Sequence, residues 1–157
     1  MSLTTQLHWF TPLATIVGGV IIFVVGQAVL KLFIEPVQNL KGTIGSTSNT
    51  MLRHQAKITN GMEDAEISAK IYDHAAELVS KAEVIICYRL AVLVFRLPSR
   101  VDVLRAAREL NAIGQATMDK RPSTTYGATP PRPLAARNNH DSLKHIAKLL
   151  RVKTAYS

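Results

Sequence analysis

The chain has 157 residues, 47% of them hydrophobic, and carries 19 Lys and Arg residues against 11 Asp and Glu residues. Once a membrane segment is set aside, about 120 residues remain, which suffices for one small domain. The single cysteine, Cys87, excludes an internal disulfide, and its apolar neighbours predict a buried, unreactive thiol.

An apolar run lies near the N-terminus. Residues 13–34 read LATIVGGVIIFVVGQAVLKLFI, in which Lys31 is the single charge. At a rise of about 1.5 Å per residue, a helix of this length spans a hydrocarbon core of about 30 Å. Pro36 is expected to end this transmembrane helix, because proline lacks an N–H group. No Lys or Arg precedes the run, which favours an uncleaved anchor over a signal peptide.

The positive charges predict the orientation of the anchor. Every Lys and Arg residue lies at or after Lys31, and residues 1–12 carry none. The positive-inside rule therefore places residues 1–12 outside as a short tail and the rest of the chain in the cytoplasm.

Small and polar residues in the span predict a contact with another helix. Thr15, Gly19 and Gly26 share one helix face, where they would let a second helix approach closely. Gln27 places an amide at membrane depth, where an unpaired polar group is unfavourable and a partner on another helix is favoured. The alternative is that glycine is simply common in membrane helices. We take these four residues as candidate oligomer contacts.

Residues 35–118 predict an all-α cytoplasmic domain. Its first helix is membrane-proximal, has a weak centre at residues 42–48 and closes at Asn60 and Gly61. Apolar residues then recur at three-to-four-residue spacing as far as Pro98, with a break expected near residue 84.

The next helix starts at Ser99, where Asp102 completes a near-capping box. We expect it to turn back on the preceding helix, so that the domain is a small helical hairpin or bundle.

Residues 84–95 are apolar almost all round, yet this segment is too short to span a bilayer. The favoured hypothesis is burial among partner subunits through Ile85, Leu90 and Leu93. The alternative is a helix at the membrane surface, with Arg89 and Arg96 reaching the headgroups.

The last quarter of the chain holds most of the positive charge. Residues 120–157 carry eight basic and one acidic side chain, against 11 and 10 in residues 1–119. Residues 119–138 predict a flexible loop rich in proline. Residues 139–157 predict a short helix and tail, capped by Asn139 or Asp141, with a basic surface made by Lys144, Lys148, Arg151 and Lys153.

This tail suits anionic membrane lipid, or no ligand at all, better than nucleic acid. Only Tyr126 and Tyr156 could stack on bases in it. Nucleic acid binding is therefore a weakly supported alternative.

No catalytic motif is present. The chain lacks a phosphate-binding glycine loop, a zinc-type Cys/His spacing and a nucleophile elbow. Asp73, His74 and Glu77 form the best polar cluster, and a di-metal site would also need the carboxylates of Glu63, Glu66 or Glu83. A solvated helix face is the favoured interpretation, so we predict no enzyme activity, no cofactor and no metal.

Two stretches carry a resemblance, IIFVVGQAVLKLFIEPVQNLKGTIG (residues 21–45) and FRLPSRVDVLRAARELNAIGQA (residues 95–116). Together they resemble a group of small, largely uncharacterised single-pass proteins of the bacterial inner membrane, in which a similar EP-Q exit precedes helices and an LPSR-type turn. The resemblance implies a protein of the bacterial inner membrane with a helical cytoplasmic domain. The architecture is also analogous to membrane-anchored, CRISPR-associated accessory proteins of phage defence that form pores, although the Arg and His motif of their nuclease-like members is missing.

Two functions are consistent with these features. The first hypothesis is self-assembly into a helical homo-oligomer, a ring, pore or scaffold at the bacterial inner membrane, with phage defence as one role. The alternative is a monomeric, membrane-anchored adaptor that binds anionic lipid, a protein partner or RNA through its basic C-terminal tail.

Overall fold

The structure of the chain is a computed structural model that describes residues 3–118 and 132–156. Every regular element in these residues is helical, which confirms the prediction of an all-α fold. The elements are α1 (Leu3–Val29), the π-helical turn η1 (Leu30–Ile34), α2 (Glu35–Arg53), α3 (Gln55–Thr59), α4 (Ala65–Val84), α5 (Tyr88–Phe95), α6 (Arg100–Met118) and α7 (Arg132–Leu150).

One continuous helix runs through α1, η1 and α2, so the prediction that Pro36 ends the first helix is wrong. Pro36 lies in the first turn of α2, where the amide of Glu35 donates to the carbonyl oxygen of Leu30, five residues earlier. A proline in a regular α-helix clashes with the carbonyl group four residues before it, here that of Leu32. The wider π turn relieves this clash, so the helix continues through the proline.

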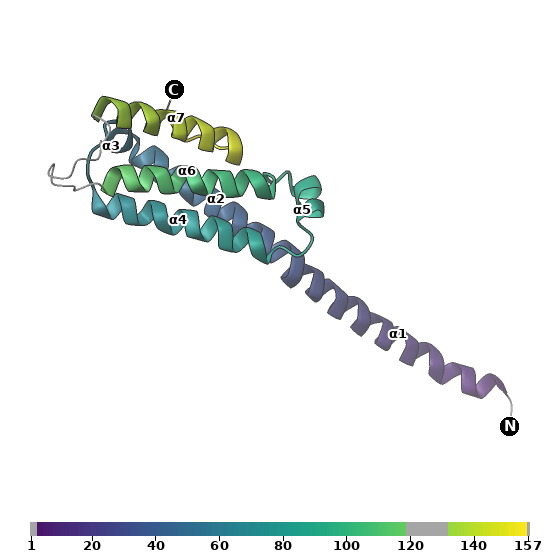
Figure 1. Ribbon diagram of the computed structural model, residues 1–157. Helices are drawn as coiled ribbons and strands as arrows, with labels where there is room; N and C mark the ends of the chain where they lie inside the picture. Colours follow the sequence, from purple (N-terminus) through teal and green to yellow (C-terminus); the bar gives the residue numbers. More distant parts are fainter. Residues whose placement is uncertain (1–2, 119–131, 157) are drawn as a thin grey trace.

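The N-terminal helix projects from the rest of the molecule (Figure 1). Among the described residues, the segment Pro12–Arg53 contains the one helix that is long and apolar enough to cross a membrane, with a mean hydropathy of 2.4 in its most apolar window. None of that window is buried against the rest of the chain. The apolar surface of residues 12–29 therefore has no cover within the described structure.

Helices α2, α4, α6 and α7 pack side by side as a bundle, in which α6 runs antiparallel to α4 and lies between α4 and α7 (Figure 1). Their apolar stripes meet in a core of fully buried side chains, which include Val37, Leu40, Met51, Ile71, Leu78, Val103, Leu110, Ile113, Leu143 and Ile146. Residues 42–48, where the sequence predicts a weak centre in the membrane-proximal helix, are helical throughout, and Thr43, Ile44 and Thr47 face this core.

Helix α4 begins and ends at specific local signals. The carboxylate of Asp64 caps it by accepting hydrogen bonds from the amides of Glu66 and Ile67, both at 3.1 Å. Just before it, Gly61 adopts a φ of 61°, a conformation that glycine tolerates without strain. The helix ends at Val84, so the predicted break is confirmed.

The connection from α4 to α6 contains the short helix α5. Cys87 lies at its start and is exposed, so the prediction of a buried thiol is wrong. The left-handed conformation of Arg96 ends α5. The predicted capping box then starts α6: the Ser99 hydroxyl donates to the Asp102 carboxylate at 2.7 Å, and the Asp102 amide donates to the Ser99 hydroxyl at 3.1 Å.

Helix α7 begins at Arg132, so neither of the two predicted caps, Asn139 and Asp141, starts it, and that prediction is wrong. Pro133 is its second residue, a position where the missing N–H has no helical partner to lose. Asn139 instead lies inside the helix and is 3% exposed. Residues 119–131 of the predicted loop lie outside the described residues.

Candidate functional site

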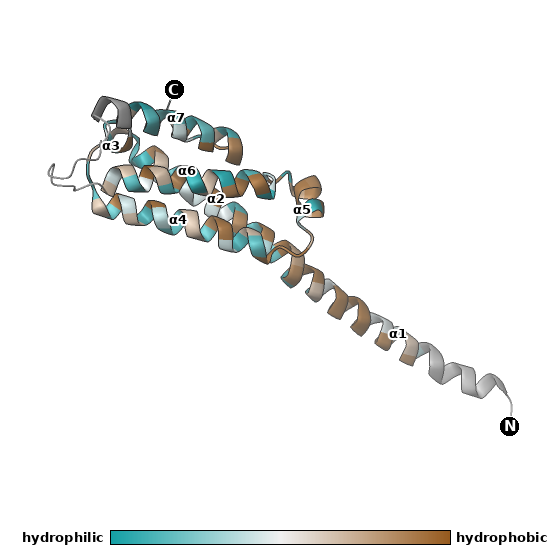
Figure 2. Cartoon of the chain, viewed as in Figure 1, coloured by the Kyte–Doolittle hydropathy of each residue, from teal (hydrophilic) through white to brown (hydrophobic). Residues whose placement is uncertain are grey.

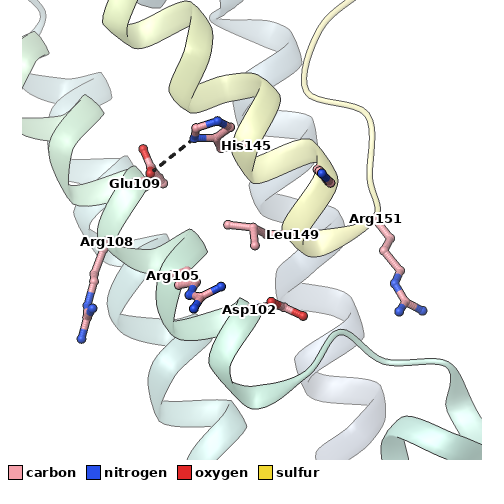
Figure 3. Close-up of a pocket in the computed structure, with 8 residues that line it drawn as sticks. Asp102, Arg105, Arg108, Glu109, His145, Leu149 and Arg151 are labelled. Carbon is pink, nitrogen blue, oxygen red and sulfur yellow. Dashed lines mark ion pairs between the residues drawn. The ribbon is translucent and has the colours of Figure 1, made fainter.

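An open groove of about 680 Å³ lies between α6 and α7 (Figure 3). Its lining is mostly charged and comprises Asp102, Arg105, Arg108, Glu109, His145, Lys148, Leu149 and Arg151. Figure 3 shows Arg105, Glu109, His145 and Leu149 at the space between the helices, while Arg108 and Arg151 extend outward at its margins.

Helical periodicity explains why these side chains line one groove. On α6, the core positions Val103, Leu110 and Ile113 are fully buried, and Arg105 and Arg108 lie on the opposite, exposed part of the helix. On α7, the residues buried in the core leave the intervening positions 145, 148 and 149 at the edge that faces α6. The amphipathic patterns that build the core therefore also set the charged lining.

The two carboxylates of the groove are already engaged within the chain. Glu109 accepts a hydrogen bond of 2.6 Å from the hydroxyl of Ser142, and its other oxygen lies 3.7 Å from Nδ1 of His145. Asp102 accepts the hydrogen bond from Ser99 that starts α6. Glu109 is thus bound to residues of α7, and Asp102 to the residue that caps α6. Among the described residues, neither carboxylate is paired with a Lys or Arg side chain of the groove.

The four basic side chains of the groove are not neutralised in this way. Within the part of the chain that the structure describes, no ion pair joins a carboxylate to Arg105, Arg108, Lys148 or Arg151. Four lysine and arginine charges thus face two carboxylates. The groove carries a net positive charge and can bind an anionic group.

The predicted basic tail is folded onto the bundle. The Ser48 hydroxyl on α2 donates to the carbonyl oxygen of Lys153, and the Thr154 hydroxyl donates to the carbonyl oxygen of Leu143 at 2.8 Å. The amide of Tyr156 donates to the side-chain oxygen of Gln55 at 3.0 Å. These contacts hold residues 153–156 in place beside α2, α3 and α7.

The predicted basic surface is therefore divided. Lys148 and Arg151 line the groove, whereas Lys144 and Lys153 are exposed elsewhere. Arg105 and Arg108 were not among the binding residues predicted from the sequence. Their spacing of three residues on an exposed face of α6 was a visible signal, but the contact with α7 that makes them part of a site is tertiary.

The Asp73, His74 and Glu77 cluster joins α4 to α2. Nε2 of His74 lies 2.8 Å from the hydroxyl of Thr50. Glu77 accepts from Lys81 at 3.0 Å and from the Thr43 hydroxyl at 3.3 Å. The hydrogen bond and charge of Lys81 lower the pKa of Glu77. Among the described residues, no group of three or more His, Cys, Asp or Glu side chains is placed to hold a metal ion.

Most of the predicted oligomer contacts lie on the surface. Gly19, Gly26 and Gln27 are exposed on α1, and a Cβ added at either glycine would meet no atom within 4 Å. Thr15 lies on the same exposed helix. Leu90 and Leu93 are exposed on α5. Ile85 differs, because it is 5% exposed and packs in the core of this chain.

Comparison with protein-family models, curated proteins and solved structures found no match to this chain.

Proposed function

We propose that this protein is a single-pass membrane adaptor that holds a helical bundle at the cytoplasmic face of the bacterial inner membrane and binds an acidic protein segment in the α6–α7 groove. The observation that carries the proposal is the set of four basic side chains that line the groove without an ion pair among the described residues. The length and hydropathy of α1 support the anchor. The positive-inside rule supports the orientation.

The lining favours an acidic protein segment over a nucleic acid. No aromatic side chain is among the lining residues, so the groove has no surface on which bases could stack. The carboxylates of Asp102 and Glu109 would repel a continuous row of phosphates. A peptide with spaced carboxylates and one apolar side chain matches this pattern better, because Leu149 adds an apolar contact among the charges.

A binding experiment with a matched control tests the groove. The full chain is reconstituted in nanodiscs of zwitterionic lipid, and a fluorescent peptide of alternating glutamate and leucine is titrated by anisotropy. We expect Arg105→Gln combined with Lys148→Gln to weaken binding at least about tenfold, equivalent to about 1.4 kcal/mol. Lys144→Gln combined with Lys153→Gln removes the same charge outside the groove, and we expect it to weaken binding less than about threefold.

Equal losses in the two double variants would contradict the groove and indicate attraction by net charge alone. Protease protection in sealed right-side-out vesicles tests the orientation separately. The bundle should be protected until the vesicles are opened.

A second candidate function is self-assembly into a ring, pore or scaffold. The observations that favour it are the open space beside Gly19 and Gly26 and the exposed apolar residues Leu90 and Leu93. Light scattering of the detergent-solubilised chain, corrected for bound detergent, measures its mass. A discrete oligomer that Gly19→Leu or Gly26→Leu dissociates would support assembly, and a monomer would contradict it.

A further inference from the structure

Helix α5 and Ile86, just before it, expose apolar side chains on one face. Ile86 is 72% exposed and Leu93 is 78% exposed, and Leu90 and Val94 are at least half exposed. The opposite side is buried, since Ala91 and the flanking Leu97 lie in the core. Helix α5 is thus attached to the bundle by one face and presents the other to the surroundings.

Tyr88 helps to fix α5 in this orientation. Its hydroxyl donates to the carbonyl oxygen of Pro98 at 3.0 Å, in the turn that precedes α6. Burial, with a smaller contribution from the charge of Asp102, raises the pKa of Tyr88 to about 12. The hydroxyl therefore stays protonated and remains a donor at any physiological pH.

Contacts with the long helix place α5 at the base of α1. The ring of Phe95 packs against that of Phe33 in η1, with centroids 5.8 Å apart. Nζ of Lys41, two turns further along α2, lies 5.7 Å from the Phe95 centroid. Figure 1 shows α5 at the end of the bundle from which α1 departs, and Figure 2 shows hydrophobic colouring both on the part of α1 nearest the bundle and on part of α5.

This position determines what covers the apolar face. Phe33 lies at the end of the apolar stretch, so a bilayer that contains α1 reaches its headgroup level beside Phe33. With 8 residues, α5 is about 12 Å long and cannot span the bilayer. Arg89 and Arg96 are exposed at its two ends, within reach of lipid phosphates.

We propose that α5 is a membrane-surface helix that inserts Ile86, Leu90, Leu93 and Val94 into the bilayer leaflet at which α1 ends. The occupant of its apolar face is lipid, because α5 lies at the base of α1, where Phe95 contacts Phe33, and both helices expose apolar side chains there. With α1, it gives the bundle a second attachment to the same membrane, which fixes its tilt. This inference rests on the anchor of the proposed function and is independent of the groove.

The native Cys87 provides a probe, because it is the single cysteine and is exposed beside Ile86. A nitroxide is attached to Cys87 of the full chain in nanodiscs made of equal parts phosphatidylcholine and phosphatidylglycerol. Collision rates with oxygen, which partitions into lipid, and with a water-soluble nickel chelate then report depth. We expect oxygen to collide more often than nickel at this position.

Two further labels, each attached to a new cysteine in a chain that also carries Cys87→Ser, distinguish a failure of the α1 anchor from a failure of the inference about α5. A label at Asn111→Cys, on the exposed part of α6, should report water. A label at Ile22→Cys should report the bilayer interior. If the Ile22→Cys label reports water, the anchor itself fails, and the proposed function with it. If that label is in lipid and the Cys87 label reports water, only the inference about α5 is overturned.

Exclusion of both oxygen and nickel from the Cys87 label would indicate contact with protein, such as a second copy of the chain, and would also overturn the inference. Leu93→Glu gives an independent check. Since Leu93 is 78% exposed, the variant retains its core, and the label at Cys87 should shift toward water. An unchanged depth in Leu93→Glu would contradict insertion through this face.

Discussion

The ring of Phe95 packs against the ring of Phe33, with centroids 5.8 Å apart and ring planes tilted by 55°. These residues are far apart in sequence, and their contact joins the end of the apolar helix to the short helix α5. A tilted pair at this distance contributes about 0.5–1.5 kcal/mol beyond the area that it buries. The pair therefore couples the long N-terminal helix to the bundle.

The first prediction concerns this coupling. A double-mutant cycle with Phe33→Leu and Phe95→Leu should give an interaction energy of about 0.5–1.5 kcal/mol, since leucine keeps the apolar contact and removes the ring pair. The measurement is chemical unfolding of the full chain in detergent micelles. A control cycle of Phe33→Leu with Leu143→Ala, in the core of α7, should be additive within about 0.5 kcal/mol. Additivity in the first cycle would show that the two rings do not interact.

The second prediction concerns the close approach of α4 and α6. A Cβ on Gly114 would lie 3.2 Å from the ring of Tyr72, and the Gly114 carbonyl oxygen accepts a buried hydrogen bond of 2.7 Å from the hydroxyl of Ser68. Gly114→Leu should therefore force the helices apart and lower the free energy of unfolding by about 1–3 kcal/mol.

Gly42 is the matched control, because a Cβ there would meet no atom within 4 Å. Gly42→Ala should raise the free energy of unfolding by about 0.5–1 kcal/mol through helix propensity alone. Thermal unfolding in micelles measures both variants. A stabilised Gly114→Leu would mean that the helices do not approach as closely as the structure has them.

The helices in which apolar residues recur every three to four positions could be predicted from the sequence. The end of α4 near residue 84 and the start of α6 at Ser99 follow from local sequence, because a loss of amphipathic pattern and a capping box act within a few residues. Pro36 does not end the first helix, because the π turn before it relieves the clash of the proline with the preceding turn. Pro133, part of the predicted proline-rich loop, instead occupies the first turn of α7, where a proline is tolerated.

The candidate groove could be predicted only in part. Lys148 and Arg151 stand out in the sequence as members of a basic segment. Their pairing with Arg105 and Arg108 depends on α7 packing against α6, and no local pattern specifies which exposed faces of two helices adjoin. The exposure of Cys87 depends on tertiary structure in the same way. A thiol between apolar neighbours is buried only if the segment faces the core.

The third prediction is a pH dependence that arises from His74. Burial lowers its pKa below the ordinary value of 6.5, and Lys81 adds to this, while Glu77 and Asp73 oppose it. Nδ1 of His74 is buried without a hydrogen-bond partner. The unfolded chain therefore binds a proton on this residue at a higher pH than the folded chain does. The free energy of unfolding is therefore unaffected by protonation of His74 above about pH 6.5, and it decreases as the pH falls from there toward the pKa of His74 in the folded chain.

Unfolding of the full chain at a series of pH values between about 7.5 and 5 tests this prediction. The free energy of unfolding should decline over that window, and His74→Gln should show a shallower decline, because glutamine does not titrate. The hydrogen bond to Thr50 gives glutamine a partner, so the variant is expected to fold. A decline of equal slope in His74→Gln would assign the pH dependence to other groups.

The fourth prediction links the stability of α7 to the groove. Nδ2 of Asn139 donates to the carbonyl oxygen of Ile58 at 2.9 Å, and this buried bond attaches α7 to α3. Asn139→Ala removes this bond, while the Ile58 carbonyl oxygen still accepts from the amide of Gly61 at 3.2 Å. The loss should lower the free energy of unfolding by about 0.5–1.5 kcal/mol. The neighbouring Asn138 is exposed on the same helix, so Asn138→Ala should change it by less than about 0.5 kcal/mol.

The same pair of variants tests whether α7 forms a wall of the binding groove. Hydrogen exchange should show faster exchange along α7 in Asn139→Ala than in Asn138→Ala, because the lost contact lies at the N-terminal half of that helix. Binding of the acidic peptide should weaken in parallel. Lys148 lies on α7 and Arg151 directly follows it, so both side chains depend on the position of this helix. Faster exchange with unchanged peptide affinity would show that the peptide binds without α7, and would place its site outside the groove.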